Sequence, residues 1–338
     1  MKRNFLTAVA VMVTAIFAGT TIAQATDFKF SGQIQPRFES IGYEDYQDNT
    51  GATVMTSTRV RFNVDADINA DTGAFLQFQS IGIWGGPGSG SNGNRHATGG
   101  GGAEVSDQLN DVGFHQAYFT LKNVATLPVN AKVGRQEIIL DGHRLIGNTV
   151  WTQGSQSHDA LLLAHAADNH TLVYVFSKGV EQGSAMGNII SGEDVSGPVG
   201  DTSDFNSHVF WANFQGIMGG DVSLYAVGVD NDIGTLNGGP LGGDFWTLGG
   251  RHVGKLFGLD YRVEAYKQLG QGGFYVANSS INAAYNHVIA GAATQGSGGS
   301  RDVDFDAEMV GIRVGKTFKN VTWSPTVTLW YDYLSGTD

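Results

Sequence analysis

Several stretches of the sequence carry arginines and carboxylates at alternating positions. In "TRVRFNVDAD" (58–67), Arg59 and Arg61 share one parity with Asp65 and Asp67, and Arg37 stands earlier in "QPRFES" (35–40). A guanidinium is planar and permanently charged, and it binds a carboxylate through two parallel hydrogen bonds. Arginines gathered along a water-filled path would select anions. Alternatively, they pair with nearby carboxylates and only solvate the wall of the path, and the residues leave both interpretations open.

A second group of residues raises the question of catalysis. The stretch "GSQSHD" (154–159) brings serine, histidine and aspartate together, the residue types of a hydrolytic triad. His158 and Asp159 would point to opposite faces of an extended strand, and no nucleophile-elbow pattern surrounds Ser155 or Ser157. The nine histidines include no pair at a recognised metal-ligand spacing, and the chain contains no cysteine. We therefore expect no enzymatic activity, no cofactor and no metal centre.

Two-residue periodicity dominates the chain, and helical periodicity is nearly absent. Thirteen stretches are predicted as strands, most of them about ten residues long, which is the length a tilted strand needs to cross a bilayer. They are 28–41, 54–68, 74–83, 112–122, 129–139, 159–166, 171–178, 206–216, 221–230, 245–254, 258–268, 303–316 and 321–334.

The connections between these stretches alternate in length. Those after even-numbered strands are short, as in "NADTG" (69–73) and "AADNH" (166–170). Those after odd-numbered strands include long glycine-rich segments at 85–111, 179–204 and 269–302. Periplasmic turns and extracellular loops of outer-membrane β-barrels differ in this way, whereas the loops of a soluble β-sandwich, the main alternative, do not sort by parity. The sequence therefore predicts an all-β fold, an antiparallel transmembrane β-barrel.

Both ends of the chain bear on this prediction. A basic start, an apolar run and the small-x-small triplet "AQA" (23–25) predict a signal peptide over 1–25 and a barrel domain over 26–338. An even number of strands returns both termini to the periplasm. Thirteen strands ending at Asp338 therefore predict a chain that is incomplete at its C-terminus, part of a larger even-numbered barrel. We expect the exported protein in the bacterial outer membrane.

Alternation assigns one face of each strand to lipid and the other to the lumen. It predicts strand arginines on the solute path, namely Arg37, Arg59, Arg61, Arg262 and Arg313. To these we add Arg135 and Arg144, which bring charge to the mouth of the path from the fifth strand and the loop after it. Their predicted acidic partners in the lumen are Glu39, Asp65, Asp67, Asp141, Asp260 and Glu264.

Two of these predictions depend on local geometry. Arg135 shares the parity of Val133, so it reaches the lumen only if Gly134 forms a bulge. Asp141 follows closely in the next loop and can hold either Arg135 or Arg144 through a charge-assisted hydrogen bond.

The run "GRQE" (134–137), the run "DGHRLIGN" (141–148), Trp151 and Asp159 together resemble the alginate-export family of outer-membrane barrels. The stretches "TRVRFNVDADIN" (58–69), "HQAYFTLKN" (115–123) and "LWYDYLSG" (329–336) support the resemblance, which extends through essentially all of the exported chain. It implies a porin-like, single-chain barrel of about eighteen strands. It also implies passage of the polyuronate alginate through an arginine-lined constriction.

We therefore expect a passive channel for anionic saccharides, polyuronates included, or for other small anions. The alternative is a general or cation-preferring porin, which suits the formal net charge of -12. A surface enzyme or adhesin that displays the glycine-rich loops is a third possibility. The expected partners are the outer-membrane lipid bilayer and the anionic solute, while any periplasmic secretion partners stay undefined. The acidic charge argues against a nucleic-acid partner.

Overall fold

The computed structural model describes residues 27–41, 53–84, 112–180, 205–231, 243–275 and 300–336. The predicted signal peptide and most of the predicted long loops lie outside these residues. The strands are β1 (Asp27–Ile41), β2 (Thr53–Asp67), β3 (Thr72–Ile83), β4 (Gly113–Leu121), β5 (Asn130–Gln136), β6 (His158–Ala166), β7 (His170–Val180), β8 (Phe205–Ile217), β9 (Gly220–Asn231), β10 (Gly243–Leu256), β11 (Leu259–Tyr275), β12 (Ser300–Phe305), β13 (Glu308–Thr317) and β14 (Thr326–Leu334). One 3-10 turn, η2 (Val124–Thr126), lies between β4 and β5.

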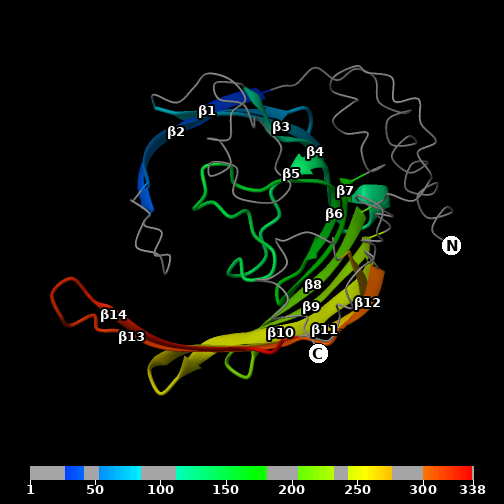
Figure 1. The fold of residues 1–338 in the computed structure, drawn as a ribbon. Helices are drawn as coiled ribbons and strands as arrows, with labels where there is room; N and C mark the ends of the chain where they lie inside the picture. The colour runs from blue at the N-terminus through cyan, green and yellow to red at the C-terminus, as the bar shows by residue number, and fades with distance from the viewer. Residues whose placement is uncertain are drawn as a thin grey trace.

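All these strands belong to one sheet that curls through most of a circle (Figure 1). Neighbours in the chain are antiparallel neighbours in the sheet from β1 to β11, and β13 and β14 complete the path. This arrangement confirms the predicted all-β antiparallel fold. No helix in the described part of the chain is long and apolar enough to cross a membrane.

The stretch 303–316, predicted as one strand, is divided in the structure. β12 pairs with one part of β11, from Gly270 to Tyr275, and β13 pairs with another part, from Asp260 to Lys267. At the junction, the backbone N–H of Gln268 donates a hydrogen bond to the Ala307 carbonyl oxygen (2.7 Å). β12 and β13 therefore occupy the place of a single strand beside β11, with a short interruption between them. Counted in this way, the fourteen strands of the structure correspond to the thirteen predicted strands.

The short connections lie where the sequence predicts them. β8 and β9 are joined by two residues, Met218 and Gly219, and β10 and β11 by Phe257 and Gly258. The predicted ends of two elements differ from the structure: β11 extends to Tyr275, into the predicted loop 269–302, and β5 ends at Gln136 although its stretch was predicted to reach 139. β5 ends early because the chain leaves the sheet at this point and turns inward.

The outer face of the sheet is apolar. Phe30, Phe62, Phe78 and Phe114 lie on four neighbouring strands, with successive ring centroids 6.1, 6.5 and 4.7 Å apart. The side chains of Phe30, Phe62 and Phe114 are exposed. A continuous band of exposed aromatic side chains is the surface that a lipid bilayer covers.

The inner face is polar and is covered by the segment 137–157, which we call the inner loop. Figure 1 shows this segment, in green, inside the curve of the sheet. Ile138 and Leu140 of the inner loop belong to one buried apolar cluster with Val175, Val209 and Tyr225 of the sheet. Burial of these side chains fixes one side of the inner loop against β7, β8 and β9.

Gly134 lies at a close approach between β4 and β5. Its φ is +122°, and a Cβ atom at this position would overlap the Ala117 carbonyl oxygen. Only glycine satisfies both conditions. Gly134 therefore allows the last residues of β5 to stay paired before the chain turns into the inner loop.

Replacing Gly134 by alanine is expected to destabilise the folded protein by about 3 kcal/mol, because strain at φ and steric overlap add. Gly216→Ala is the matched control: its φ is +75°, and no atom lies within 4 Å of its Cβ position. The control should lower the free energy of unfolding by about 1–2 kcal/mol, because only the positive φ is unfavourable for alanine there. Urea unfolding in detergent micelles, followed by tryptophan fluorescence, measures both. Equal midpoints for the two variants would contradict the steric argument.

Candidate functional site

Arg59 anchors the inner loop to the first strands of the sheet. Its side chain is fully buried, at 0% exposure, and its Nη1 donates to the carbonyl oxygens of Thr152 (3.3 Å) and Gln153 (3.1 Å). Its Nη2 donates to Gln33 Oε1 (2.9 Å) and Gln35 Oε1 (2.5 Å). These acceptors are neutral oxygen atoms within the protein. Arg59 therefore holds the inner loop against β1 and β2.

Further contacts bind the same part of the inner loop. Arg37 donates to the Trp151 carbonyl oxygen, and its Nη2 lies 2.6 Å from Glu39 Oε1. Gln79 Nε2 donates to the carbonyl oxygen of Gly154 (3.0 Å). The pairing of Arg37 with Glu39 is one of the two arrangements that the sequence left open, and here it accompanies a structural contact with the loop.

Glu137, the first residue of the inner loop, connects the two ends of that loop to the sheet. Its Oε1 lies 2.8 Å from His115 Nε2 and 3.3 Å from Arg61 Nη1. Its Oε2 accepts a hydrogen bond from Asn148 Nδ2 (2.8 Å), and its Oε1 lies 3.4 Å from Ser155 Oγ. The buried guanidinium of Arg61 thus has a carboxylate partner that the sequence analysis did not select.

Asp141 anchors the opposite side of the inner loop. Its carboxylate accepts hydrogen bonds from Trp211 Nε1 (3.0 Å), Ser223 Oγ (3.0 Å) and the Tyr225 hydroxyl (2.5 Å). Arg251 Nη1 lies 3.4 Å from its Oδ1. The prediction that Asp141 pairs with Arg135 or Arg144 is therefore corrected: the partners of Asp141 lie on β8, β9 and β10.

Four arginines gather between the inner loop and the last strands of the sheet, and we call them the basic cluster. Its members are Arg144, Arg251, Arg262 and Arg313. Arg144 Nε and Arg262 Nε lie 3.7 and 3.4 Å from Oε1 of Glu264, whose side chain is 1% exposed. Arg251 is opposite Glu264 in the register, and Arg313 is opposite Arg262.

The basic cluster carries more positive than negative charge. Among the described residues, the carboxylates in contact with it are Glu264, Asp141 and Asp332, the last 3.0 Å from Arg144 Nη2. Three carboxylates against four guanidinium groups leave one positive charge. Within the described residues, Arg251, Arg262 and Arg313 each have a buried donor without a hydrogen-bond acceptor, as do Arg59 and Arg61 on the other side of the lumen. Buried donors of this kind normally bind water or a ligand.

Arg135 is corrected from the lumen to the outer face. It lies opposite Asp159, which is two residues from Leu161 and therefore on the same outer face of β6. The Nε and Nη2 atoms of Arg135 donate hydrogen bonds to the Asp159 carboxylate (2.9 and 2.6 Å). Gln136, the next residue, is fully buried on the inner face. The bulge that would have turned Arg135 inward does not form, because Gly134 stays in register with Tyr118 and Ala160.

The remaining predicted carboxylates lie apart from the arginines. Asp67 pairs with Lys29 (2.9 Å), and Asp260 pairs with Lys255 (2.7 Å), each near a short turn. Asp65 is exposed. These carboxylates lie at the end of the sheet where the short turns are, which we call the short-turn end, and they do not neutralise the basic cluster.

Sequence reasoning missed Glu137 and Arg251, although a signal existed for each. Glu137 belongs to the "GRQE" run, whose function could not be assigned because its partners are distant in sequence. Arg251 could have been placed opposite Glu264 by counting back from the two-residue turn at Phe257 and Gly258. The tightness of that turn was not recognised.

The serine, histidine and aspartate of 154–159 do not come together as a triad. Ser155 Oγ donates to the Asn148 carbonyl oxygen (2.7 Å), and Asp159 pairs with Arg135 on the other face. Among the described residues, no group of three or more histidines and carboxylates is arranged to hold a metal ion.

A curved antiparallel sheet with an apolar outer face and a charged inner face defines the class of outer-membrane β-barrel channels. A sequence model of the family described as alginate export matches residues 27–338. The chain therefore belongs to the alginate export family, and it is a channel of the bacterial outer membrane.

A comparison with solved structures lists two porins among its matches. A BenF-like porin from Pseudomonas fluorescens Pf-5 is 12% identical, with 92% of this chain and 94% of that chain covered and a TM-score of 0.38. OccD3 (OpdP) of Pseudomonas aeruginosa is 13% identical, with 92% and 73% covered and a TM-score of 0.38. A comparison with curated proteins finds no match.

Replacing Glu137 by glutamine keeps its size and removes the charge that faces Arg61 and His115. We expect a loss of about 1–2 kcal/mol in the attachment of the inner loop, because a buried guanidinium loses its carboxylate. Trypsin should then cut after Arg144, within the loop, about tenfold faster in detergent solution, since cleavage follows the population of the open form. Fragment masses identify the cut.

Asp260→Asn is the control for this experiment. It removes an ion pair of comparable length, but the Lys255 and Asp260 side chains are 78% and 54% exposed and lie at the β10–β11 turn. Such a surface pair contributes little to stability. A rate of cleavage after Arg144 that is the same in Glu137→Gln as in the wild type would show that the carboxylate does not hold the loop.

Proposed function

We propose that the protein passes anionic saccharides, polyuronates of the alginate kind among them, across the outer membrane by passive diffusion past the basic cluster. The observation that carries this proposal is the excess of guanidinium groups over carboxylates between the inner loop and β10–β14. The description of the family as alginate export supports the same class of solute.

The chemistry of the basic cluster suits a chain of carboxylates. A polyuronate presents one carboxylate on each sugar ring, and a guanidinium binds a carboxylate through a planar fork of N–H donors. Buried donors without a protein acceptor, on Arg251, Arg262 and Arg313, are points where such a group would gain hydrogen bonds. A single excess charge attracts an anion without holding it tightly, as conduction requires.

In this proposal Arg37, Arg59 and Arg61 hold the inner loop in place and do not contact the solute. They were expected to line the path, but their hydrogen bonds go to the inner loop, to Glu39 and to Glu137. The loop that they hold carries Arg144 and Asp141 to the opposite side of the lumen. The arginines of β1 and β2 therefore position the narrow part of the channel, and those of β10–β13 contact the solute.

A general or cation-preferring porin is the second candidate. The net charge of -12 and the exposed carboxylates near the short turns favour it, because they would concentrate cations at that entrance. Transport is proposed in both cases, and catalysis in neither.

The test is the zero-current potential of the protein in a planar bilayer under a potassium chloride gradient, followed by addition of oligomannuronate. The wild type should be anion-selective and blocked by the oligosaccharide. Arg262→Gln with Arg313→Gln should remove the selectivity and weaken the block at least tenfold, since each lost charged hydrogen bond is worth about 1.5–3 kcal/mol. Arg144 remains in this variant to pair with Glu264.

Lys255→Gln is the matched control, because it removes a positive charge at the short-turn end and leaves the basic cluster intact. Its selectivity and block should equal those of the wild type. A cation-selective wild type without block would replace the proposal with the general-porin function. A double variant that keeps both properties would show that the solute path avoids Arg262 and Arg313.

A further inference from the structure

An indole ring lies beside the basic cluster on the inner face of β14. Trp330 is opposite Arg313 in the register, and Arg313 is opposite Arg262. The next inward position of β14 is Asp332, which lies 3.0 Å from Arg144 of the inner loop. Because residues two apart on a strand share a face, Trp330 faces the lumen together with Asp332.

Trp330 is an exception to the pattern of the strand that carries it. The side chains before and after it on the inner face, Thr328 and Asp332, are polar, whereas Leu329 and Tyr331 belong to the apolar outer face. The Trp330 side chain is 65% exposed. Exposure of an indole to water is unfavourable, and a ligand with an apolar face would cover it.

Arg313 holds the indole in place. The central carbon atom of its guanidinium lies over the Trp330 ring, 4.1 Å from the ring centroid. A cation–π contact of this kind does not use the N–H groups of the guanidinium as donors to an acceptor. Among the described residues, Arg313 Nε and Arg262 Nη2 are buried donors without a hydrogen-bond acceptor. An exposed aromatic ring and unsatisfied donors therefore occur side by side.

These two features match the two parts of a uronate ring. One face of a pyranose ring presents C–H groups, which pack on the negative face of an indole, and the carboxylate projects from the edge of the ring. A guanidinium in contact with the indole can bind the carboxylate of the same sugar.

We propose that Trp330 is a platform on which one sugar ring of the solute stacks, with its carboxylate at Arg313 and Arg262. The platform rests on the proposed function, since the solute is the same anionic saccharide. It adds recognition of the sugar ring to attraction of the charge.

Two other roles of Trp330 lead to different expectations. A small inorganic anion would be bound by guanidinium groups alone, and the indole would contribute nothing to its passage. A tryptophan that only positions Arg313 would affect every anion equally, whether or not it carries a sugar ring. Stacking, in contrast, affects saccharides and leaves the selectivity between small ions unchanged.

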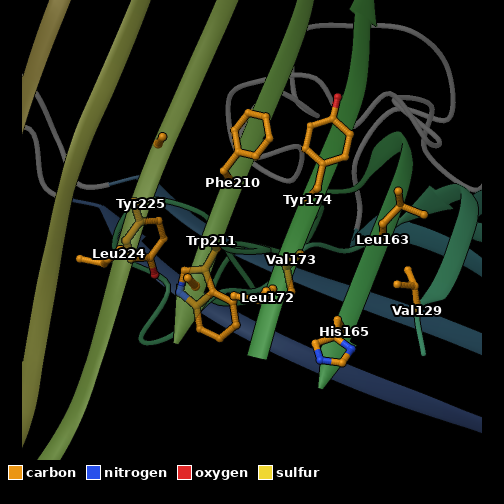
Figure 2. Close-up of a pocket in the computed structure, with 12 residues that line it drawn as sticks. Val129, Leu163, His165, Leu172, Val173, Tyr174, Phe210, Trp211, Leu224 and Tyr225 are labelled. Atoms are coloured by element: carbon orange, nitrogen blue, oxygen red, sulfur yellow. The ribbon is translucent and has the colours of Figure 1, made fainter. Parts of the chain in front are cut away.

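The hollow shown in Figure 2 is a less suitable place for a sugar. It measures about 540 Å³ and is lined by apolar side chains such as Phe210 and Leu224. These residues are adjacent in sequence to Trp211 and Tyr225, which contact Asp141 of the inner loop, so they point to the outer face of the sheet. The hydroxyl groups of a saccharide would lose hydrogen bonds in such surroundings.

The experiment measures the block of ion current in a planar bilayer by oligomannuronate and by a neutral oligomannose of the same length. Trp330→Thr keeps every charge of the basic cluster and continues the polar inner face of β14. Its zero-current potential should equal that of the wild type, whereas its block by oligomannuronate should be about fivefold weaker. The weaker block of the wild type by oligomannose should disappear. Trp330→Phe retains an aromatic face and should stay within about twofold of the wild type.

Trp84→Thr is the matched control. The Trp84 side chain is 66% exposed, close to the value for Trp330. Its Nε1 donates a hydrogen bond to Thr58 Oγ1 (2.8 Å), and Thr58 is adjacent to the inward-facing Arg59, so this contact lies on the outer face. Block and selectivity of Trp84→Thr should equal those of the wild type.

The outcomes separate the platform from the proposed function. Equal block of Trp330→Thr and the wild type would overturn the platform and leave the anion path intact. Loss of anion selectivity together with the block would also overturn it, because Trp330 would then only position Arg313. A wild type without anion selectivity that oligomannose blocks through Trp330 would support the platform and overturn the proposed function. A wild type that neither oligosaccharide blocks would overturn both.

Discussion

The Glu137 carboxylate lies where the chain leaves the sheet, and it binds groups from three separate parts of the protein. Arg61 comes from β2, His115 from β4, and Asn148 and Ser155 from the second half of the inner loop. A buried carboxylate is costly unless hydrogen-bond donors and positive charges compensate it. The start of the loop, its end and the wall of the lumen are therefore fixed together.

The position of the basic cluster follows from that fixed loop. Arg144 stands in the middle of the inner loop and reaches Glu264 and Asp332, more than a hundred residues away in sequence. Arg251 and Arg262 come from the sheet itself, and the loop brings Asp141 to Arg251. Positive charge is thus concentrated on one side of the lumen, while the buried arginines of the other side are used to hold the loop. The same residue type has two roles because its neighbours differ.

Local rules account for most of the fold. Alternation separates Arg59 and Arg61 from Val60 and Phe62, and the structure places the two arginines on the inner face, because a strand cannot turn one side chain without turning its neighbours. Short turns fix the registers of the hairpins, and both features are readable in the sequence. The division of β12 from β13 is not, since it depends on a single irregular step against β11.

The path of the inner loop could not be predicted, because its contacts join residues far apart in the chain. Arg59 meets Thr152 and Gln153 across more than ninety positions, and no periodicity encodes such a pairing. The error at Arg135 has a different origin. Alternation alone places it outside with Val133, and the prediction of a lumen position required a bulge that the register of Gly134 excludes.

The run from Gly134 to Glu137 shows how four consecutive residues can serve two surfaces and a loop. Gly134 permits the close approach to β4, Arg135 faces outward to Asp159, Gln136 is buried inside, and Glu137 begins the inner loop. Because side chains alternate with a period of two, inserting one residue between Gly134 and Glu137 would exchange the outward and inward positions. The ion pair of Arg135 with Asp159 and the attachment of the inner loop are thus linked by backbone geometry, even though they lie on opposite faces of the sheet.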